Sequence, residues 1–199
     1  MKVLLSSNYL LSNTKCVTIG LKKVKEKFDV VVRFSGERHF LCNQFEWLAF
    51  YNELPAILEF LNEENPVTSR NTTLPTMQVS IYDGEVILKC IATWNTTYFS
   101  KHNIGNLIAL SPVIFNKITQ LNEQAVLVEY IYKCIVDEIT KNLVECDEIQ
   151  AAFQELPRSI QIKNIKEQVT GYRYRGNFLF MEIAILLEND IAEDVLLKI

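Results

Sequence analysis

Hydrophobic positions follow two periods in succession near the start of the chain. Short β-rich runs at residues 16–19, 28–34 and 38–42, the longest stopped by Ser35-Gly36, predict strands. The period then changes to three and four residues, which places apolar side chains on one face of an amphipathic helix. The positions on that face are Trp47, Phe50, Tyr51, Leu54, Ile57, Leu58 and Leu61.

Asn43 is predicted to begin this helix. Its side chain can accept a hydrogen bond from an unpaired amide, and Glu46 can reach back to the amide of Asn43, as in a capping box. Pro55 lies inside the helical pattern and predicts a kink or a break, because proline lacks the backbone N–H.

A linker-like stretch at residues 62–75 separates this pattern from a second copy of it. Residues 77–81 alternate, Asp83-Gly84 is a favoured hairpin turn, and residues 86–94 form a strongly β run. A polar excursion follows, and residues 106–110 predict a further strand. Ser111-Pro112 then predicts a helix start, with Ser as cap and Pro in the first turn. Its apolar face carries Phe115, Ile118, Leu121, Ala125 and Val126.

Aligning Asn43 with Ser111 pairs Phe40 with Ile108 and Trp47 with Phe115. We therefore predict an α+β protein in which a small antiparallel sheet followed by an amphipathic helix occurs twice, arranged as a pseudo-dimer. The predicted division is a first repeat at 1–65, a linker at 66–75, a second repeat at 76–135 and a C-terminal extension at 136–199 that packs on the repeats. Beyond the repeats we predict a helix over 127–156, a strand over 159–165, an apolar strand over 177–187 and a short tail helix after it.

Composition and charge narrow the functional classes. The 199 residues are 49% hydrophobic and 22% charged, which is typical of a compact globular protein. With 20 basic and 24 acidic residues the net charge is -4, which counts against binding duplex nucleic acid over the whole surface but leaves room for a local basic face.

The residues that could carry catalysis or bind metal show no matching pattern. The five cysteines include no CxxC pair, so we predict free thiols, no zinc site and no cofactor. His39 and His102 lie in no nucleophile motif, so we predict no enzyme activity. No signal peptide or membrane-spanning run is predicted, so the expected location is cytoplasmic or nuclear.

Strands followed by a helix that opens with Leu-Ser-Pro, with Phe115 beyond, resemble the positive-cofactor-four type of single-stranded-DNA-binding transcriptional coactivator domain. The similar segments are residues 79–81, 83–89 and 106–111 in the second repeat, and 17–19, 28–34 and 40–47 in the first. In that family a curved four-stranded sheet precedes one helix, and members dimerise through their helices. The resemblance implies single-stranded nucleic acid as partner, in replication or transcription, with two copies in one chain forming the pseudo-dimer.

The resemblance also implies a sheet face of basic and aromatic side chains that grip and stack on single strands. The candidates are Lys22, Lys23, Lys25, Lys27 and Arg33 in the first repeat, and Lys89, Trp94, Tyr98 and Lys101 in the second. The lysine run around residues 22–27 equally fits a solvated hairpin. Farther along, aromatic and cationic residues alternate, which suits base stacking with phosphate contacts and suits an ordinary edge strand equally. These residues are Tyr172, Arg173, Tyr174 and Arg175.

A second functional class stays open beside nucleic-acid binding. A structural or assembly protein could use the same fold for contacts between copies, and the acidic total and the apolar segment at 177–187 favour it. Self-association is expected in both classes. A third reading, an acidic protein that engages basic DNA-binding proteins, has less support because the acidic residues are not clustered.

Overall fold

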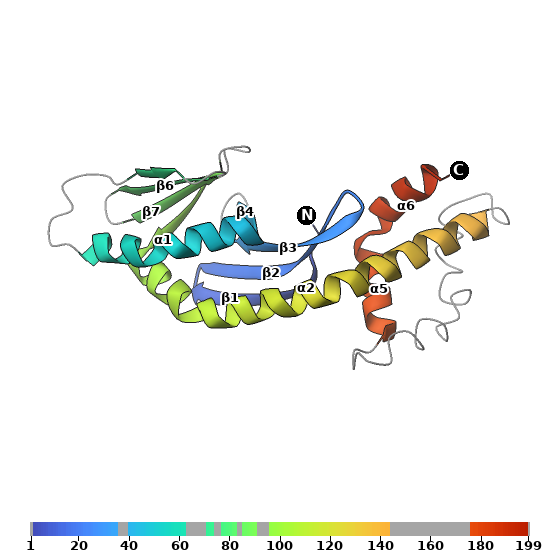
Figure 1. Ribbon diagram of the computed structural model, residues 1–199, viewed down its shortest axis with the longest axis horizontal. Coiled ribbons are helices and arrows are strands. Elements are labelled where there is room, and N and C mark those ends of the chain that lie inside the picture. The colour runs from blue at the N-terminus through green and yellow to red at the C-terminus, as the bar shows by residue number, and fades with distance from the viewer. Residues whose placement is uncertain are drawn as a thin grey trace. The chain divides into compact units, whose positions relative to one another are not determined.

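The computed structural model describes residues 2–35, 40–62, 71–73, 77–82, 85–90, 96–143 and 176–198. The chain is α+β and contains two antiparallel sheets, in which each strand lies beside its neighbour in sequence, in the orders β1-β2-β3-β4 and β5-β6-β7-β8 (Figure 1). The strands are β1 (Leu4–Ser12), β2 (Lys15–Val24), β3 (Lys27–Phe34), β4 (Phe40–Asn43), β5 (Asn71–Thr73), β6 (Met77–Tyr82), β7 (Glu85–Cys90) and β8 (Thr96–Ser100). The helices are α1 (Gln44–Asn62), α2 (Lys101–Leu143), α5 (Gly176–Leu186) and α6 (Glu188–Leu196).

The predicted order of a sheet followed by a helix, occurring twice, is confirmed. Strands β1–β4 precede α1, and strands β5–β8 precede α2. Alternate positions are buried on β7 and β8, as period-two patterning requires, whereas β2 buries residues 17–21 without interruption. Val32 and Phe34 are buried on β3, and Val86 and Leu88 are buried on β7.

The start of α1 is the predicted capping box. The Asn43 side chain accepts hydrogen bonds from the amides of Phe45 (2.9 Å) and Glu46 (3.0 Å), and the Glu46 carboxylate accepts one from the Asn43 amide (2.7 Å). The helix buries Trp47, Phe50, Leu54 and Ile57, all on the predicted face. Pro55 is exposed and α1 is not divided there.

The predicted start of the second helix at Ser111 is wrong. Helix α2 begins at Lys101, so residues 106–110 are helical, and the last strand of the sheet is β8 within the polar excursion. The cap is Ser100: its Oγ accepts a hydrogen bond from the Asn103 amide (3.2 Å), and Asn103 Oδ1 accepts one from the Ser100 amide (3.2 Å). Inside the helix, Ser111 donates its hydroxyl hydrogen to the Leu107 carbonyl (2.8 Å). Proline at residue 112 therefore lies within the helix and does not mark its start.

Aligning the two observed caps, Asn43 with Ser100, gives the register of the repeat. The buried positions of α1 then fall on Ile104, Leu107, Ser111 and Ile114 of α2, and all four are buried. In the last strands, Phe40 and Cys42 fall on Thr97 and Phe99, which are also buried. Burial thus matches position by position, which the alignment on Ser111 does not achieve.

The chain forms two compact units that cut across the repeats. Unit 1 comprises Met1–Leu5, Lys22–Phe28 and Glu123–Ile199, and unit 2 comprises Ser6–Leu21 and Asp29–Asn122. The predicted boundaries at 65, 75 and 135 and the pseudo-dimer arrangement stay predictions. Within the predicted linker, Asn71–Thr73 form β5 and pair with β6.

The C-terminal predictions have different outcomes. The apolar segment predicted as a strand at 177–187 falls almost wholly in helix α5, so that prediction is wrong, because a short run that is apolar throughout has no period to separate strand from helix. The predicted helix over 127–156 is confirmed as far as Leu143. The rest of it, and the predicted strand at 159–165, lie outside the described residues.

Aromatic rings form the core of unit 2. Phe34 on β3 meets Phe99 on β8 edge-on, with ring centroids 5.1 Å apart, and also contacts Trp47 and Phe50 of α1. Tyr51 of α1 packs on Phe115 of α2 at 4.9 Å, and farther along Asn122 donates to Gln44 (3.0 Å). These contacts place α1 antiparallel to the first half of α2. Elements of both repeats therefore share one core.

Candidate nucleic-acid interface

One side of the β5–β8 sheet is polar and unburied. Strand alternation separates it from the buried side, which carries Val79, Ile81, Val86, Leu88, Thr97 and Phe99. The described side chains of the opposite side form what we term the polar face. They are Gln78, Ser80, Glu85, Ile87, Lys89, Thr96, Tyr98 and Ser100.

Tyr98 is the most prominent group on the polar face. Its side chain is on β8, 50% of the residue is exposed, and its cross-strand partner is Ile87 on β7. Two residues after Ile87 on β7, Lys89 is paired with Thr96 on β8 and with Gln78 on β6. The face therefore combines an aromatic and aliphatic pair with an adjacent cation, hydroxyls and an amide.

Three predicted site residues come together in this part of unit 2. Lys89 and Tyr98 belong to adjacent strands, and Lys101 is exposed at the first position of α2, directly after β8. Glu85 lies on the same face at the other end of β7, where it is paired with Ser100 next to Lys101. Trp94, Tyr172, Arg173, Tyr174 and Arg175 lie outside the described residues.

Arg33 lies on the other sheet of unit 2, in a polar row that crosses β3, β2 and β1. Its Nη2 donates to Thr18 Oγ1 (3.4 Å), and the Thr18 hydroxyl donates to Asn8 Oδ1 (2.6 Å). Asp29, four residues before Arg33 and on the same side of β3, is exposed. Arg33 is thus partly buried and held by a neighbour, so it does not project freely from the sheet.

The lysine hairpin, Lys22–Phe28 of unit 1, is only partly available to a ligand. Lys25 and Lys27 are exposed and Lys22 is half-buried. The Lys23 side chain is only 14% exposed, because its ammonium lies 3.1 Å from Asp194 Oδ2 and 5.1 Å from the centroid of the Tyr132 ring. The predicted role of Lys23 as an exposed phosphate contact does not fit this position.

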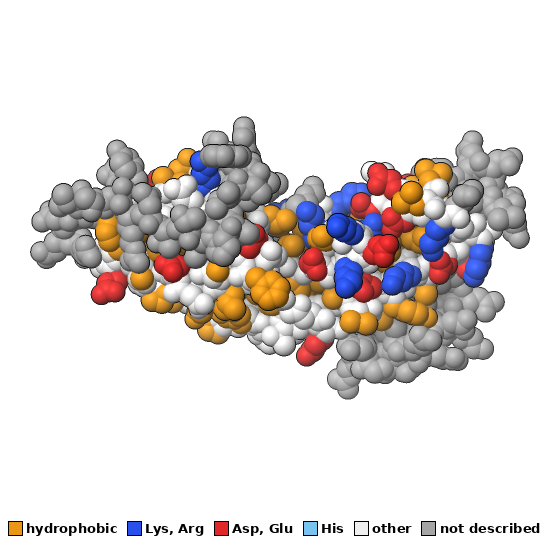
Figure 2. Space-filling model, turned by 45° about the horizontal axis from the view of Figure 1, so that its top comes forward, with side chains coloured by type: hydrophobic (Ala, Val, Ile, Leu, Met, Phe, Trp, Pro, Cys, Tyr) orange, Lys and Arg blue, Asp and Glu red, His pale blue; other side chains and the backbone are white. Residues whose placement is uncertain are grey.

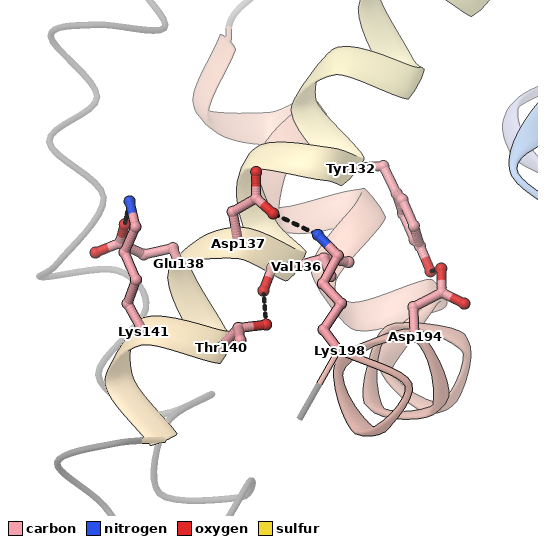
Figure 3. Close-up of polar contacts among 8 residues, drawn as sticks. All are labelled: Tyr132, Val136, Asp137, Glu138, Thr140, Lys141, Asp194 and Lys198. Atoms are coloured by element: carbon pink, nitrogen blue, oxygen red, sulfur yellow. Dashed lines mark hydrogen bonds and ion pairs between the residues drawn. The ribbon is translucent and has the colours of Figure 1, made fainter.

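Tyr132 organises the surroundings of Lys23 in unit 1. Its hydroxyl donates to Asp194 Oδ2 (2.8 Å), as Figure 3 shows, and its ring meets Phe28 edge-on at 5.5 Å. Burial, reinforced by the hydrogen bond to Asp194, raises the pKa of Tyr132 above its ordinary value. The hairpin is further fixed because the Phe28 amide donates to Glu129 Oε1 (3.1 Å). No local sequence signal could have found this cluster, since its members are far apart along the chain.

Lys15 is a second cation that the sequence did not single out. In unit 2 its ammonium donates to the Ser35 carbonyl (3.2 Å) and to Thr97 Oγ1 (3.1 Å), and it lies 5.7 Å from the Phe99 ring centroid. Burial lowers the pKa of Lys15, and nearby Glu85 opposes that shift. Lys15 thus links β2 to β8 from the buried side of the second sheet and is not part of the polar face.

Charges are mixed on the surface shown in Figure 2. Lysine and arginine side chains there are interspersed with aspartate and glutamate, and hydrophobic side chains gather beside them. Among the side chains described on that face, the basic ones therefore form no continuous stripe of the kind that dominates duplex binding.

Among the residues that the structure describes, no three His, Cys, Asp or Glu side chains are grouped so as to hold a metal ion, and no helix combines the length and apolar character of a membrane span. In comparisons with known proteins, no protein-family model and no curated protein matches the chain. The likeness to the positive-cofactor-four type of domain accordingly stays a prediction.

Proposed function

We propose that this protein binds single-stranded nucleic acid on the polar face, without catalysis, in replication or transcription. The observation that carries the proposal is Tyr98, half-exposed beside Ile87 on a sheet face that is otherwise polar. An exposed aromatic ring on a sheet provides a stacking platform for an unpaired base. Lys89 on the neighbouring strand and Lys101 directly after β8 would contact backbone phosphates.

The charge distribution favours a single strand over a duplex. Duplex binding draws mainly on many phosphate contacts, whereas on single strands base stacking adds about 1–3 kcal/mol per base to the phosphate contacts. With Glu85 on the same face and a net charge of -4, stacking has to supply most of the affinity. Binding that weakens steeply with salt would support phosphate contacts beside the stacking.

Fluorescence anisotropy with a labelled oligothymidylate tests this function. Replacing Tyr98 with Ala should weaken binding by about fivefold to 150-fold, the equivalent of one lost stacking interaction. Tyr130→Ala is the matched control, because Tyr130 is also exposed but lies on α2 in unit 1, and it should leave affinity unchanged. Absence of binding by the unaltered chain at low salt, or equal effects of the two substitutions, would rule the proposal out.

Exposed apolar side chains on α1 favour a second candidate, assembly through contacts between copies. Phe45 is 74% exposed and Leu48 is 45% exposed, and residues three apart lie side by side on a helix. Sedimentation velocity on the double variant Phe45→Ser/Leu48→Ser distinguishes this candidate. Dissociation of an oligomer with unchanged oligonucleotide affinity would assign α1 to assembly. A monomer before and after the change would remove the candidate.

A further inference from the structure

Two hydrogen-bond donors in unit 1 converge on a single oxygen. The Lys23 ammonium is 3.1 Å from Asp194 Oδ2, and the Tyr132 hydroxyl donates to that same oxygen at 2.8 Å. Tyr132 is buried and the Lys23 side chain is largely so. A cation and a hydroxyl aimed at one point, over an aromatic ring, form a receptor for an anionic oxygen.

The anion that occupies this receptor belongs to α6, which is acidic along its length. The helix carries Glu188, Asp190, Glu193 and Asp194. It is held in unit 1 by a narrow apolar side, on which Ile191 and Val195 are buried, and Lys198 beyond its end pairs with Asp137 (Figure 3). Asp194 is the acid of this helix whose carboxylate contacts both donors. The neighbouring Glu193 is exposed.

We propose that Lys23 and Tyr132 form a phosphate site that Asp194 occupies in place of ligand, so that α6 competes with the backbone of a single strand for the lysine hairpin. The proposal relies on the proposed function for the identity of the ligand, a phosphodiester of nucleic acid. The exposed Lys25 and Lys27 on the same hairpin would meet neighbouring phosphates once α6 is displaced. The hairpin thereby becomes a regulated phosphate-binding site of unit 1, since α6 limits its availability.

An oligomer that has phosphates but no bases isolates this site from the polar face. Anisotropy is measured with a labelled abasic deoxyribose-phosphate oligomer and with oligothymidylate, on the full chain. Asp194→Asn should bind both probes about threefold to tenfold more tightly at low salt, with a salt slope more negative by about 0.7, the value for one added phosphate contact on a single strand. Glu193→Gln, which removes the same charge from the adjacent position, should change affinity less than about twofold.

The double variant Lys23→Gln/Asp194→Asn tests whether the gain acts through Lys23. It should bind the abasic oligomer no better than the unaltered chain. Hydrogen exchange should also show that Ile191–Val195 amides lose protection when the oligomer binds the unaltered protein, which a purely structural ion pair would not produce.

Each result has one interpretation. If Asp194→Asn and Glu193→Gln behave alike, or if the gain persists without Lys23, the phosphate site is refuted while binding at Tyr98 can still stand. If Asp194→Asn gains affinity for the abasic oligomer while Tyr98→Ala changes nothing, the phosphate site stands and the polar face is refuted. Inorganic phosphate that competes as well as the oligomer at equal ionic strength would overturn the assignment to a nucleic-acid backbone.

Discussion

Helices α1 and α2 begin with the same kind of reciprocal N-terminal cap but differ in length. Asn43 with Glu46, and Ser100 with Asn103, form reciprocal caps, and the first turns after both caps bury the same four positions. Helix α1 ends at Asn62, whereas α2 continues to Leu143. The continuation buries Val128, Ile131, Tyr132, Ile135, Val136 and Ile139 in unit 1. Helix α1 thus packs in the core of unit 2 alone, whereas α2 contributes to the cores of both units. This explains why the compact units do not coincide with the repeats.

The largest expected effect comes from the aromatic core that the two repeats share. Phe34→Ala should cost about 3–5 kcal/mol, because Phe34 is fully buried and its ring meets Phe99 of the second repeat as well as α1. By strand register its counterpart in the second repeat is Leu88, and Leu88→Ala should cost about 2–5 kcal/mol. Urea unfolding followed by circular dichroism measures both.

The matched control for these core changes is Leu10→Ala. Leu10 is 75% exposed on β1, so its loss should change the free energy of unfolding by no more than about 0.5 kcal/mol. If Phe34→Ala costs no more than Leu10→Ala, the shared core is wrong. If it unfolds only one sheet, the repeats fold independently.

The first helix was predictable because its signals are local and agree, whereas strand β1 (Leu4–Ser12) was not predicted. A strong cap residue, a Glu three positions on and a long period of three and four all point to α1. In the second repeat the Ser111-Pro112 pair imitates a helix start, while the real cap at Ser100 has Asn103 in place of the usual Glu or Gln. The strand before that cap alternates over only five residues, too few to stand out from a loop.

The candidate site was predictable only where sequence neighbours share a sheet. Lys89, Tyr98 and Lys101 come together because β7 and β8 are adjacent in sequence and pair with each other. Lys23 is held by Tyr132 and Asp194. Because these two residues are far from Lys23 along the chain, no periodicity or motif in the sequence indicates the contact. Tertiary contacts of this kind decide whether a lysine in a basic run is an available charge or a structural one.

Removing each observed cap tests whether the two helix starts are equivalent. Asn43→Ala and Ser100→Ala should both reduce the free energy of unfolding, each by about 1 kcal/mol, because each leaves amides of the first helical turn without a partner. Urea unfolding of the two variants, compared in one buffer, measures the costs. Very unequal costs would show that α2 draws its stability from unit 1 and not from its cap.

Ser111→Ala gives the smallest and most discriminating change in the same series. The Ser111 hydroxyl donates to the Leu107 carbonyl inside α2, a bond whose loss is offset by the better helix propensity of Ala, so stability should change by less than about 0.5 kcal/mol. If Ser111 were the cap, this change would cost about 1 kcal/mol and Ser100→Ala would cost almost nothing. Which of the two variants loses more unfolding free energy therefore decides which serine aligns with Asn43. That alignment sets the register of the whole repeat.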